Sequence, residues 1–282
     1  MSAPVWKISE NELDLTSGPI IMGILNVTPD SFSDGGEHNL PVEAINHAQR
    51  MRDEGAVIID VGGESTRPGS GEVSLEEERR RVMPVIEALC RDGAIVSVDT
   101  SKPEIMTEAA ALGAQILNDV RAFTLPGAAE AAAATDCGLV IMHRTEDAPR
   151  RSDDVVGDVL EYLMERERVL TQLGVERSRI CLDPGFGFGK TPEENFELIA
   201  WTERFIETGL PVMTALSRKS SLGAVTGRKD PHERVVASVA GALLAVERGA
   251  HIVRVHDVAE TFDAFSVREA VHAAYDRRCW SE

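Results

Sequence analysis

Eight short apolar runs alternate with eight longer amphipathic stretches, and this alternation limits the possible folds more than any other feature of the chain. Most of the short runs are continuously apolar, which is typical of strands buried on both faces of a parallel sheet. The predicted strands are Ile20–Leu25, Val57–Val61, Ile95–Val98, Gln115–Leu117, Leu139–Met142, Arg179–Leu182, Val212–Leu216 and Ile252–Val255. The predicted helices are Val42–Glu54, Ser74–Arg91, Pro103–Leu112, Pro126–Thr135, Asp154–Leu173, Pro192–Glu207, His232–Arg248 and Val258–Arg277.

Strict alternation of eight strands with eight helices predicts an α/β fold, a single (β/α)8 TIM barrel. A doubly wound open sheet is the alternative, but eight regular units favour closure. Glycine recurs between a helix and the next strand, where it commonly ends helices. Because no linker, charge block or low-complexity tract divides the chain, residues 1–282 are predicted to form one domain.

Composition excludes some classes of partner and compartment. The formal net charge of −18 argues against nucleic acid or a membrane surface as a partner, because both are polyanionic. The first 15 residues lack the basic start and apolar run of a signal peptide, and no segment approaches the roughly 18 apolar residues of a membrane span. The four cysteines are far apart in sequence and form no C-x-x-C pair, so a reducing cytoplasm is expected.

Polar and glycine-rich clusters follow the predicted strands, whereas the segments that enter the strands are plain. The clusters are residues 26–36, 62–69, 99–103, 118–120, 143–145, 183–190, 217–220 and 255–257. Each alone has a structural explanation: Asp99 or Asp183 could cap a helix, and His256 could be a packing residue. The carboxyl ends of all strands meet at one mouth of a barrel, where the active sites of such barrels lie. Eight clusters at one mouth therefore favour a binding site.

The residue types at this mouth suggest what it binds. Asp99, Asn118 and Asp183 offer hydrogen-bond acceptors at neighbouring strand ends, and they match the N–H edge of an aminopyrimidinone ring. Lys219 could donate to a carbonyl or nitrogen of the same ring.

A second group of residues suits a phosphate-like anion. Arg67, Arg254 and His256 supply cationic donors, and the last two share one face of a strand because they are two positions apart. Asn26 and the carboxylates of Asp30 and Asp34 form a hard-oxygen set that suits Mg²⁺ bridged to a diphosphate.

The chain resembles the dihydropteroate synthase family of pterin-binding (β/α)8 barrels. The longest matching segments are MGILNVTPDSFSDGG at 22–36 and DVGGESTRPG at 60–69. Shorter ones are SVDT at 97–100, NDV at 118–120, DPGFGFGKT at 183–191, SRKS at 217–220 and RVHD at 254–257. The match spans roughly residues 20–260, in order and in frame with the predicted strands.

The resemblance implies a transferase of folate biosynthesis, in which 4-aminobenzoate displaces pyrophosphate from (7,8-dihydropterin-6-yl)methyl diphosphate. It implies that the pterin is bound by Asp99, Asn118, Asp183 and Lys219, with Met142 in the pocket wall. The diphosphate is assigned to Asn26, which also holds Mg²⁺, and to Arg254 and His256. Loops bearing Asp34, Thr66, Arg67 and Pro68 would close over the site, and the aminobenzoate would lie near Thr66, Pro68, Phe188, Lys219 and Ser220.

Of these residues, Asp34, Arg67 and Lys219 are predicted to be catalytic. The resemblance also implies a homodimer formed through late barrel helices, and a target of sulfonamides. A dissociative route is expected, because the motifs contain no candidate nucleophile and a dihydropterin can carry a methylene cation.

Two positions depart from the usual family pattern. Residues 142–146 read MHRTE where members more often have MHMQG, and Ala215 stands where a glycine is common. Two other functions remain open at this point. A barrel that passes a methyl group from a reduced folate to a corrinoid would share Asp99, Asn118 and Asp183, but would not need Arg254 with His256. A non-catalytic pterin-binding paralogue would be expected to lose loop residues that are present here.

Overall fold

The computed structural model describes residues 5–28, 40–64, 71, 73–148 and 151–279, and it confirms the predicted barrel. The strands are β1 (Val5–Ile8), β2 (Asn11–Asp14), β3 (Ile20–Asn26), β4 (Ile58–Gly62), β5 (Ile95–Asp99), β6 (Ile116–Asp119), β7 (Gly138–Met142), β8 (Ile180–Asp183), β9 (Met213–Thr214) and β10 (Ile252–Val255). The helices are α1 (Leu40–Asp53), α2 (Leu75–Arg91), α3 (Pro103–Ala111), α4 (Ala128–Ala133), α5 (Val155–Gln172), α6 (Pro192–Ala200), α7 (Thr202–Ile206), α8 (Ser220–Thr226), α9 (Val235–Glu247) and α10 (Val258–Cys279). Two 3₁₀ turns, η2 (Arg177–Arg179) and η3 (Pro231–Arg234), precede β8 and α9.

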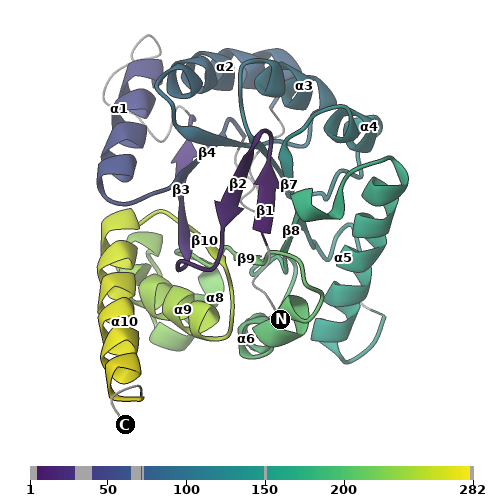
Figure 1. Cartoon of the computed structure of the whole chain (residues 1–282). Helices are drawn as coiled ribbons and strands as arrows, with labels where there is room; N and C mark the ends of the chain where they lie inside the picture. Colours follow the sequence, from purple (N-terminus) through teal and green to yellow (C-terminus); the bar gives the residue numbers. More distant parts are fainter. Residues whose placement is uncertain (1–4, 29–39, 65–70, 72, 149–150, 280–282) are drawn as a thin grey trace.

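The eight strands from β3 onward form one parallel sheet that closes on itself. Its order is β8-β7-β6-β5-β4-β3-β10-β9, and the ring is completed by a parallel bridge between Leu182 and Val212. At that seam the N–H of Leu182 donates to the carbonyl of Pro211 at 2.9 Å. The helices surround the sheet on its outer face (Figure 1). The closed ring excludes the open doubly wound sheet.

An N-terminal hairpin that the sequence analysis did not predict covers one end of the barrel. Strands β1 and β2 pair antiparallel, and Figure 1 shows them lying across the centre of the ring. Trp6 and Ile8 are fully buried there, and the indole N–H of Trp6 donates to the carbonyl of Arg179 at 2.9 Å. A Cβ on Gly138 would lie 2.6 Å from Ile8, so β7 begins with the one residue that admits this close approach.

The other differences from the predicted elements are local. The predicted helix over 192–207 breaks at Trp201, where the Thr202 hydroxyl donates to the carbonyls of Leu198 and Ile199 and competes with the helix N–H groups. The short helix α8 forms a separate element after the seventh strand, and η3 adds a 3₁₀ turn before α9. Strand β6 runs two residues further than predicted and so includes Asn118.

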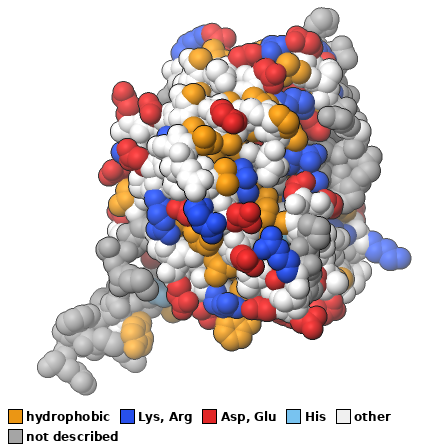
Figure 2. All heavy atoms as spheres, turned by 90° about the vertical axis from the view of Figure 1, so that its right-hand side faces the viewer, with side chains coloured by type: hydrophobic (Ala, Val, Ile, Leu, Met, Phe, Trp, Pro, Cys, Tyr) orange, Lys and Arg blue, Asp and Glu red, His pale blue; other side chains and the backbone are white. Residues whose placement is uncertain are grey.

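The surface over α4 and α5 is mixed in character. Figure 2 shows acidic and basic side chains interspersed on this face, with hydrophobic side chains in small groups between them. Such a surface is ordinary for a globular protein and offers no broad basic field to a polyanion. No helix in the described part of the chain is long and apolar enough to cross a membrane.

Candidate active site

The inside of the barrel changes from apolar to charged along the strands. Near the hairpin, the inward positions are apolar and form one buried cluster: Met22, Ile58, Ile116, Val140, Cys181, Met213 and Ile252, packed against Trp6 and Ile8. Side chains two positions apart in a strand point to the same face. The next inward positions are therefore Ile24, Asp60, Asn118, Met142, Asp183, Ala215 and Arg254. Strand register alone brings these groups together at the carboxyl end.

A buried ion-pair network lies at this level. The guanidinium of Arg254 donates from Nε to Asp60 at 2.5 Å and from Nη2 to Asp99 at 2.7 Å. The Asn118 amide also donates to Asp60, at 3.1 Å. Burial raises the pKa of Asp99 to about 7, although the charge of Arg254 opposes the shift. Arg254 was predicted at the diphosphate, and the structure shows that two of its nitrogens hold carboxylates, while Nη1 makes no hydrogen bond to a described residue.

Asp60 is a site residue that the sequence analysis missed. Its side chain is fully buried, and its Oδ1 has no hydrogen-bond partner among the described residues. An acceptor buried without a partner is costly, which makes it a candidate to accept an N–H from a bound ligand. The signal was present in the sequence, because an aspartate in the middle of a buried strand needs a partner inside the fold.

Asp183 and Lys219 face each other across the end of β8. Burial raises the pKa of the Asp183 carboxyl, opposed by the charge of Lys219 and by the Gly185 N–H, which donates at 2.8 Å. Burial lowers the pKa of Lys219 to about 8. Its ammonium donates to the carbonyl of Phe186 and lies 4.4 Å from the centre of the Phe188 ring. Lys219 is therefore mostly protonated at neutral pH, but it loses its proton at a lower pH than an ordinary lysine.

Arg218, the residue before Lys219, is held by several hydrogen bonds and so fixes the backbone next to Lys219. Arg218 adopts a left-handed conformation with φ of 60°, which is strained for a residue other than glycine. Its N–H donates to Ser238 at 2.8 Å, its Nε donates to Asp257 at 3.1 Å, and its carbonyl accepts from Arg234 at 2.9 Å. These contacts hold Arg218 in place directly before Lys219.

The remaining predicted residues within the described chain lie around the same mouth. Nδ1 of His256 lies 3.0 Å from the hydroxyl of Ser217, and Asn26 is a half-buried residue at the end of β3. Met142 is buried and pairs in register with Asp183. Ser220 is exposed at the first position of α8.

Five predicted site residues, Asp30, Asp34, Thr66, Arg67 and Pro68, lie outside the described residues, so their roles stay predictions. The two departures from the family pattern can be placed. Ala215 is buried at the inward position after Met213, and Thr145 donates from its hydroxyl to the carbonyl of Phe188 at 3.1 Å.

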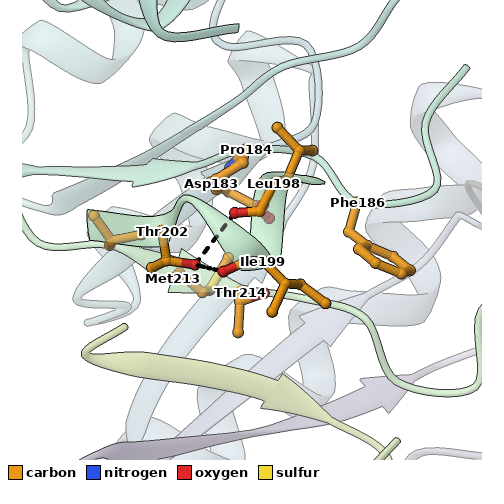
Figure 3. Close-up of a pocket in the computed structure, with 9 residues that line it drawn as sticks. Asp183, Pro184, Phe186, Leu198, Ile199, Thr202, Met213 and Thr214 are labelled. Carbon is orange, nitrogen blue, oxygen red and sulfur yellow. Dashed lines mark hydrogen bonds between the residues drawn. The ribbon is translucent and has the colours of Figure 1, made fainter. Parts of the chain in front are cut away.

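A small cavity lies behind Asp183, between β8, β9 and α6 (Figure 3). Its walls include Phe186, Leu198 and Ile199. Two lining residues, Thr202 and Thr214, carry hydroxyl groups. Figure 3 shows the Thr202 hydroxyl bonded to the carbonyls of Leu198 and Ile199 at the end of α6, at 3.2 and 2.9 Å. We interpret the cavity as a packing gap beside the site.

Comparison with known proteins identifies the class of this site. Residues 22–256 match the family model described as pterin binding enzyme. The chain therefore belongs to the pterin-binding enzyme family. Within that family it is 48% identical over 272 residues to the dihydropteroate synthase of Escherichia coli K12, covering 94% of this chain and 96% of that protein.

Solved structures agree. The Xanthomonas albilineans dihydropteroate synthase with 4-aminobenzoic acid superposes with a TM-score of 0.91 at 49% identity, over 96% of this chain and 99% of that one. The Yersinia pestis dihydropteroate synthase with a sulfonamide drug complex gives 0.88 at 44% identity, over 95% and 99%.

Proposed function

We infer that this chain catalyses the dihydropteroate synthase reaction. The amine of 4-aminobenzoate forms a C–N bond to the methylene of (7,8-dihydropterin-6-yl)methyl diphosphate, while the C–O bond to pyrophosphate breaks and the amine loses a proton. The observation that carries this inference is the convergence of Asp99, Asn118, Asp183 and Lys219 at one barrel mouth, in a family that binds pterins.

Recognition of the pterin follows from the charges of these groups. The carboxylates of Asp183 and Asp99, and the unpaired oxygen of Asp60, accept N–H groups along the amino edge of the ring. Lys219 donates to the ring from the opposite side. Arg254 binds the carboxyl groups of Asp60 and Asp99 and fixes them in place, so the acceptors are positioned before the substrate arrives.

The leaving diphosphate is assigned to His256, to Nη1 of Arg254 and to Asn26. Asn26 offers a neutral oxygen at the mouth, and its side chain has no hydrogen-bond partner among the described residues, so it fits a Mg²⁺ that takes its other ligands from phosphate and water. Such an ion would neutralise charge on the diphosphate as it departs. Asp34 and Arg67 are assigned to this step from the family resemblance.

We propose a dissociative route, in which the C–O bond breaks before the amine adds. The cysteines whose side chains are described supply no nucleophile: burial raises the pKa of Cys181 well above its ordinary value, and Cys90 and Cys137 lie outside the barrel. Positional isotope exchange provides the test. With ¹⁸O in the bridging position and no 4-aminobenzoate, scrambling into non-bridging positions supports dissociation, and a bridging label that stays in place contradicts it.

We also propose that the chain forms a homodimer through α9 and α10. Helix α9 is apolar on almost every face, and Val236 and Leu244 remain exposed on it. Val267 and Val271 are exposed on α10, and Glu247 of α9 binds Arg268 of α10, which holds the two exposed stripes side by side. Helices that are apolar all round are usually covered. Leu244→Glu should shift the sedimentation coefficient from dimer to monomer, and an unchanged value would contradict this interface.

Cytoplasmic location and inhibition by sulfonamides complete the proposal. The cysteines Cys90, Cys137 and Cys181 are free thiols, as expected in a reducing compartment. A sulfonamide should compete with 4-aminobenzoate and leave the KM of the pterin diphosphate unchanged. Steady-state assay of pyrophosphate release at several sulfonamide concentrations tests both the reaction and this competition.

A further inference from the structure

The loop that joins β8 to α6 carries both groups that Lys219 contacts. Residues 184–191 hold the Phe186 carbonyl and the Phe188 ring against the Lys219 ammonium. The loop has no regular structure of its own, so its shape depends on what holds it. Two separate sets of contacts do so.

One set fixes the first half of the loop to α6 and α8. The N–H of Gly187 donates to the side chain of Asn195 at 2.6 Å, and the Asn195 amide donates to Ser221 at 3.0 Å. Asn195 is fully buried, and a Cβ on Gly187 would lie 2.7 Å from the Lys219 chain. These contacts define where the loop passes Lys219, but they do not reach Phe188.

The second set gathers on the Phe188 carbonyl. This oxygen accepts from the backbone N–H of Thr145 at 3.4 Å, from the Thr145 hydroxyl at 3.1 Å and from the ammonium of Lys190 at 3.3 Å. Lys190 also donates to the carbonyls of Gly185 at 2.9 Å and His143 at 3.4 Å. A single ammonium thus links three carbonyls of the β7–α5 and β8–α6 loops.

Holding the loop with Lys190 has a cost in stability, because the ammonium group is buried. Its hydrogen bonds within the described residues go to carbonyls and to no carboxylate, and burial lowers its pKa to about 7. Burying a charge among carbonyls costs stability, and the opposite charges of Asp183 and Glu146 offset only part of that cost. Thr145 stands where family members more often have glutamine, and a Cβ on Gly189 would lie 2.6 Å from its Cβ, so the two loops touch here.

We propose that Lys190 and Thr145 are positioning residues that fix the Phe188 carbonyl, and thereby hold the Phe188 ring against Lys219 on the side of the site that takes the arylamine. The inference rests on the proposed function, because it assigns the Phe188 side of the mouth to 4-aminobenzoate. It predicts that these contacts, the Lys190–Thr145 lock, affect the affinity for the arylamine more than that for the pterin diphosphate, since every pterin acceptor except Asp183 lies on another strand.

The test compares Lys190→Met and Thr145→Val with Lys7→Met, a control lysine on the hairpin at the other end of the barrel. Lys190→Met keeps the length of the side chain but removes its donors, and should raise the KM for 4-aminobenzoate about tenfold. Thr145→Val removes one neutral hydrogen bond and should raise it about threefold. The KM for the pterin diphosphate should stay within about twofold of wild type in all three variants. Equal increases in both KM values, or a lowered melting temperature with unchanged KM values, would overturn the proposal.

A double-mutant cycle shows whether Lys190 acts through Phe188. In a Phe188→Leu background, Lys190→Met should add less than about twofold to the KM for 4-aminobenzoate, because the ring it positions is gone. Full additivity would overturn the proposal. The proposed function fails separately, if the wild-type protein forms no product from the two substrates. In that case a crystal structure of Lys190→Met still decides: a displaced Phe188 ring supports the lock, and an unmoved ring contradicts it.

Discussion

The two ends of the barrel are built from neighbouring positions on the same strands, yet they serve opposite purposes. At the hairpin end, Ile58, Ile116 and Cys181 fill the interior with apolar groups under Trp6. Two residues further along the same strands, the interior holds Asp60, Asn118 and Asp183. Apolar burial stabilises the fold, whereas burial of charge opposes it. The first end therefore stabilises the barrel, and the second uses that stability to hold charged groups ready for a substrate.

This contrast predicts the largest effect on stability at the hairpin end. Trp6→Ala removes a fully buried indole and should lower the free energy of unfolding by about 3–5 kcal/mol. The kcat/KM should be unchanged at temperatures where the variant is folded, because Trp6 lies far from the mouth. Chemical denaturation measures the first quantity and steady-state kinetics the second. Trp201→Ala, at an exposed tryptophan, is the control and should change stability by less than about 0.5 kcal/mol.

At the mouth the pattern should reverse. Asp183→Asn keeps the shape of the side chain and the acceptor for the Gly185 N–H. It removes the negative charge of a carboxyl group whose pKa burial raises. We expect kcat/KM for the pterin diphosphate to fall about 100-fold, from the loss of charge-assisted hydrogen bonds. The melting temperature should stay the same or rise slightly. A large loss of stability with retained activity would break the comparison between the two ends.

The pH dependence should also come from the mouth. Asp99 must be ionised to accept hydrogen bonds, and its pKa is raised to about 7, so activity falls below that pH. Lys219 must be protonated to donate, and its pKa is lowered to about 8, so activity falls above that pH. The profile of kcat/KM should be a narrow bell, falling about tenfold per pH unit on each side. In Asp99→Asn the acidic limb should disappear, and a limb that persists would assign it to another group.

The smallest effect is expected at the departure from the family pattern in the seventh unit. Ala215 is buried at an inward position, in the same set of positions as Asn118 and Asp183. Ala215→Gly removes one methyl group, and should change the dissociation constant of the pterin by no more than about threefold. Isothermal titration of a pterin ligand would measure it. A tenfold change would show that this methyl shapes the pocket.

Much of the fold could be predicted because it follows from local pattern. Continuous apolar runs such as Leu139–Met142 and the glycines between helix and strand define the units, and the direction of the strands defines which end of the barrel is the mouth. The hairpin was missed because its strands are only four residues long and carry Lys7 and Glu12, so their pattern is too short to read. It is held by contacts with Gly138 and Arg179, which no local pattern can show.

The site was predicted in part for the same reason. Asp99, Asn118 and Asp183 stand at the ends of apolar runs, where a polar residue is easily recognised. Asp60 lies inside the predicted strand, and the polar cluster of its motif begins only at Gly62. The second role of Arg254, as the partner of Asp60, depends on contact across the barrel between residues 194 positions apart. The lock at Lys190 likewise depends on two loops meeting.

The most direct test of the central claim is pyrophosphate release by the purified protein given the pterin diphosphate, Mg²⁺ and 4-aminobenzoate, with Lys219→Ala beside it. The account predicts release that requires both substrates, and a fall of about 100- to 1,000-fold in kcat/KM in a variant that remains folded. Tight pterin binding without release by the wild-type protein would contradict it and favour a non-catalytic pterin-binding role for this barrel.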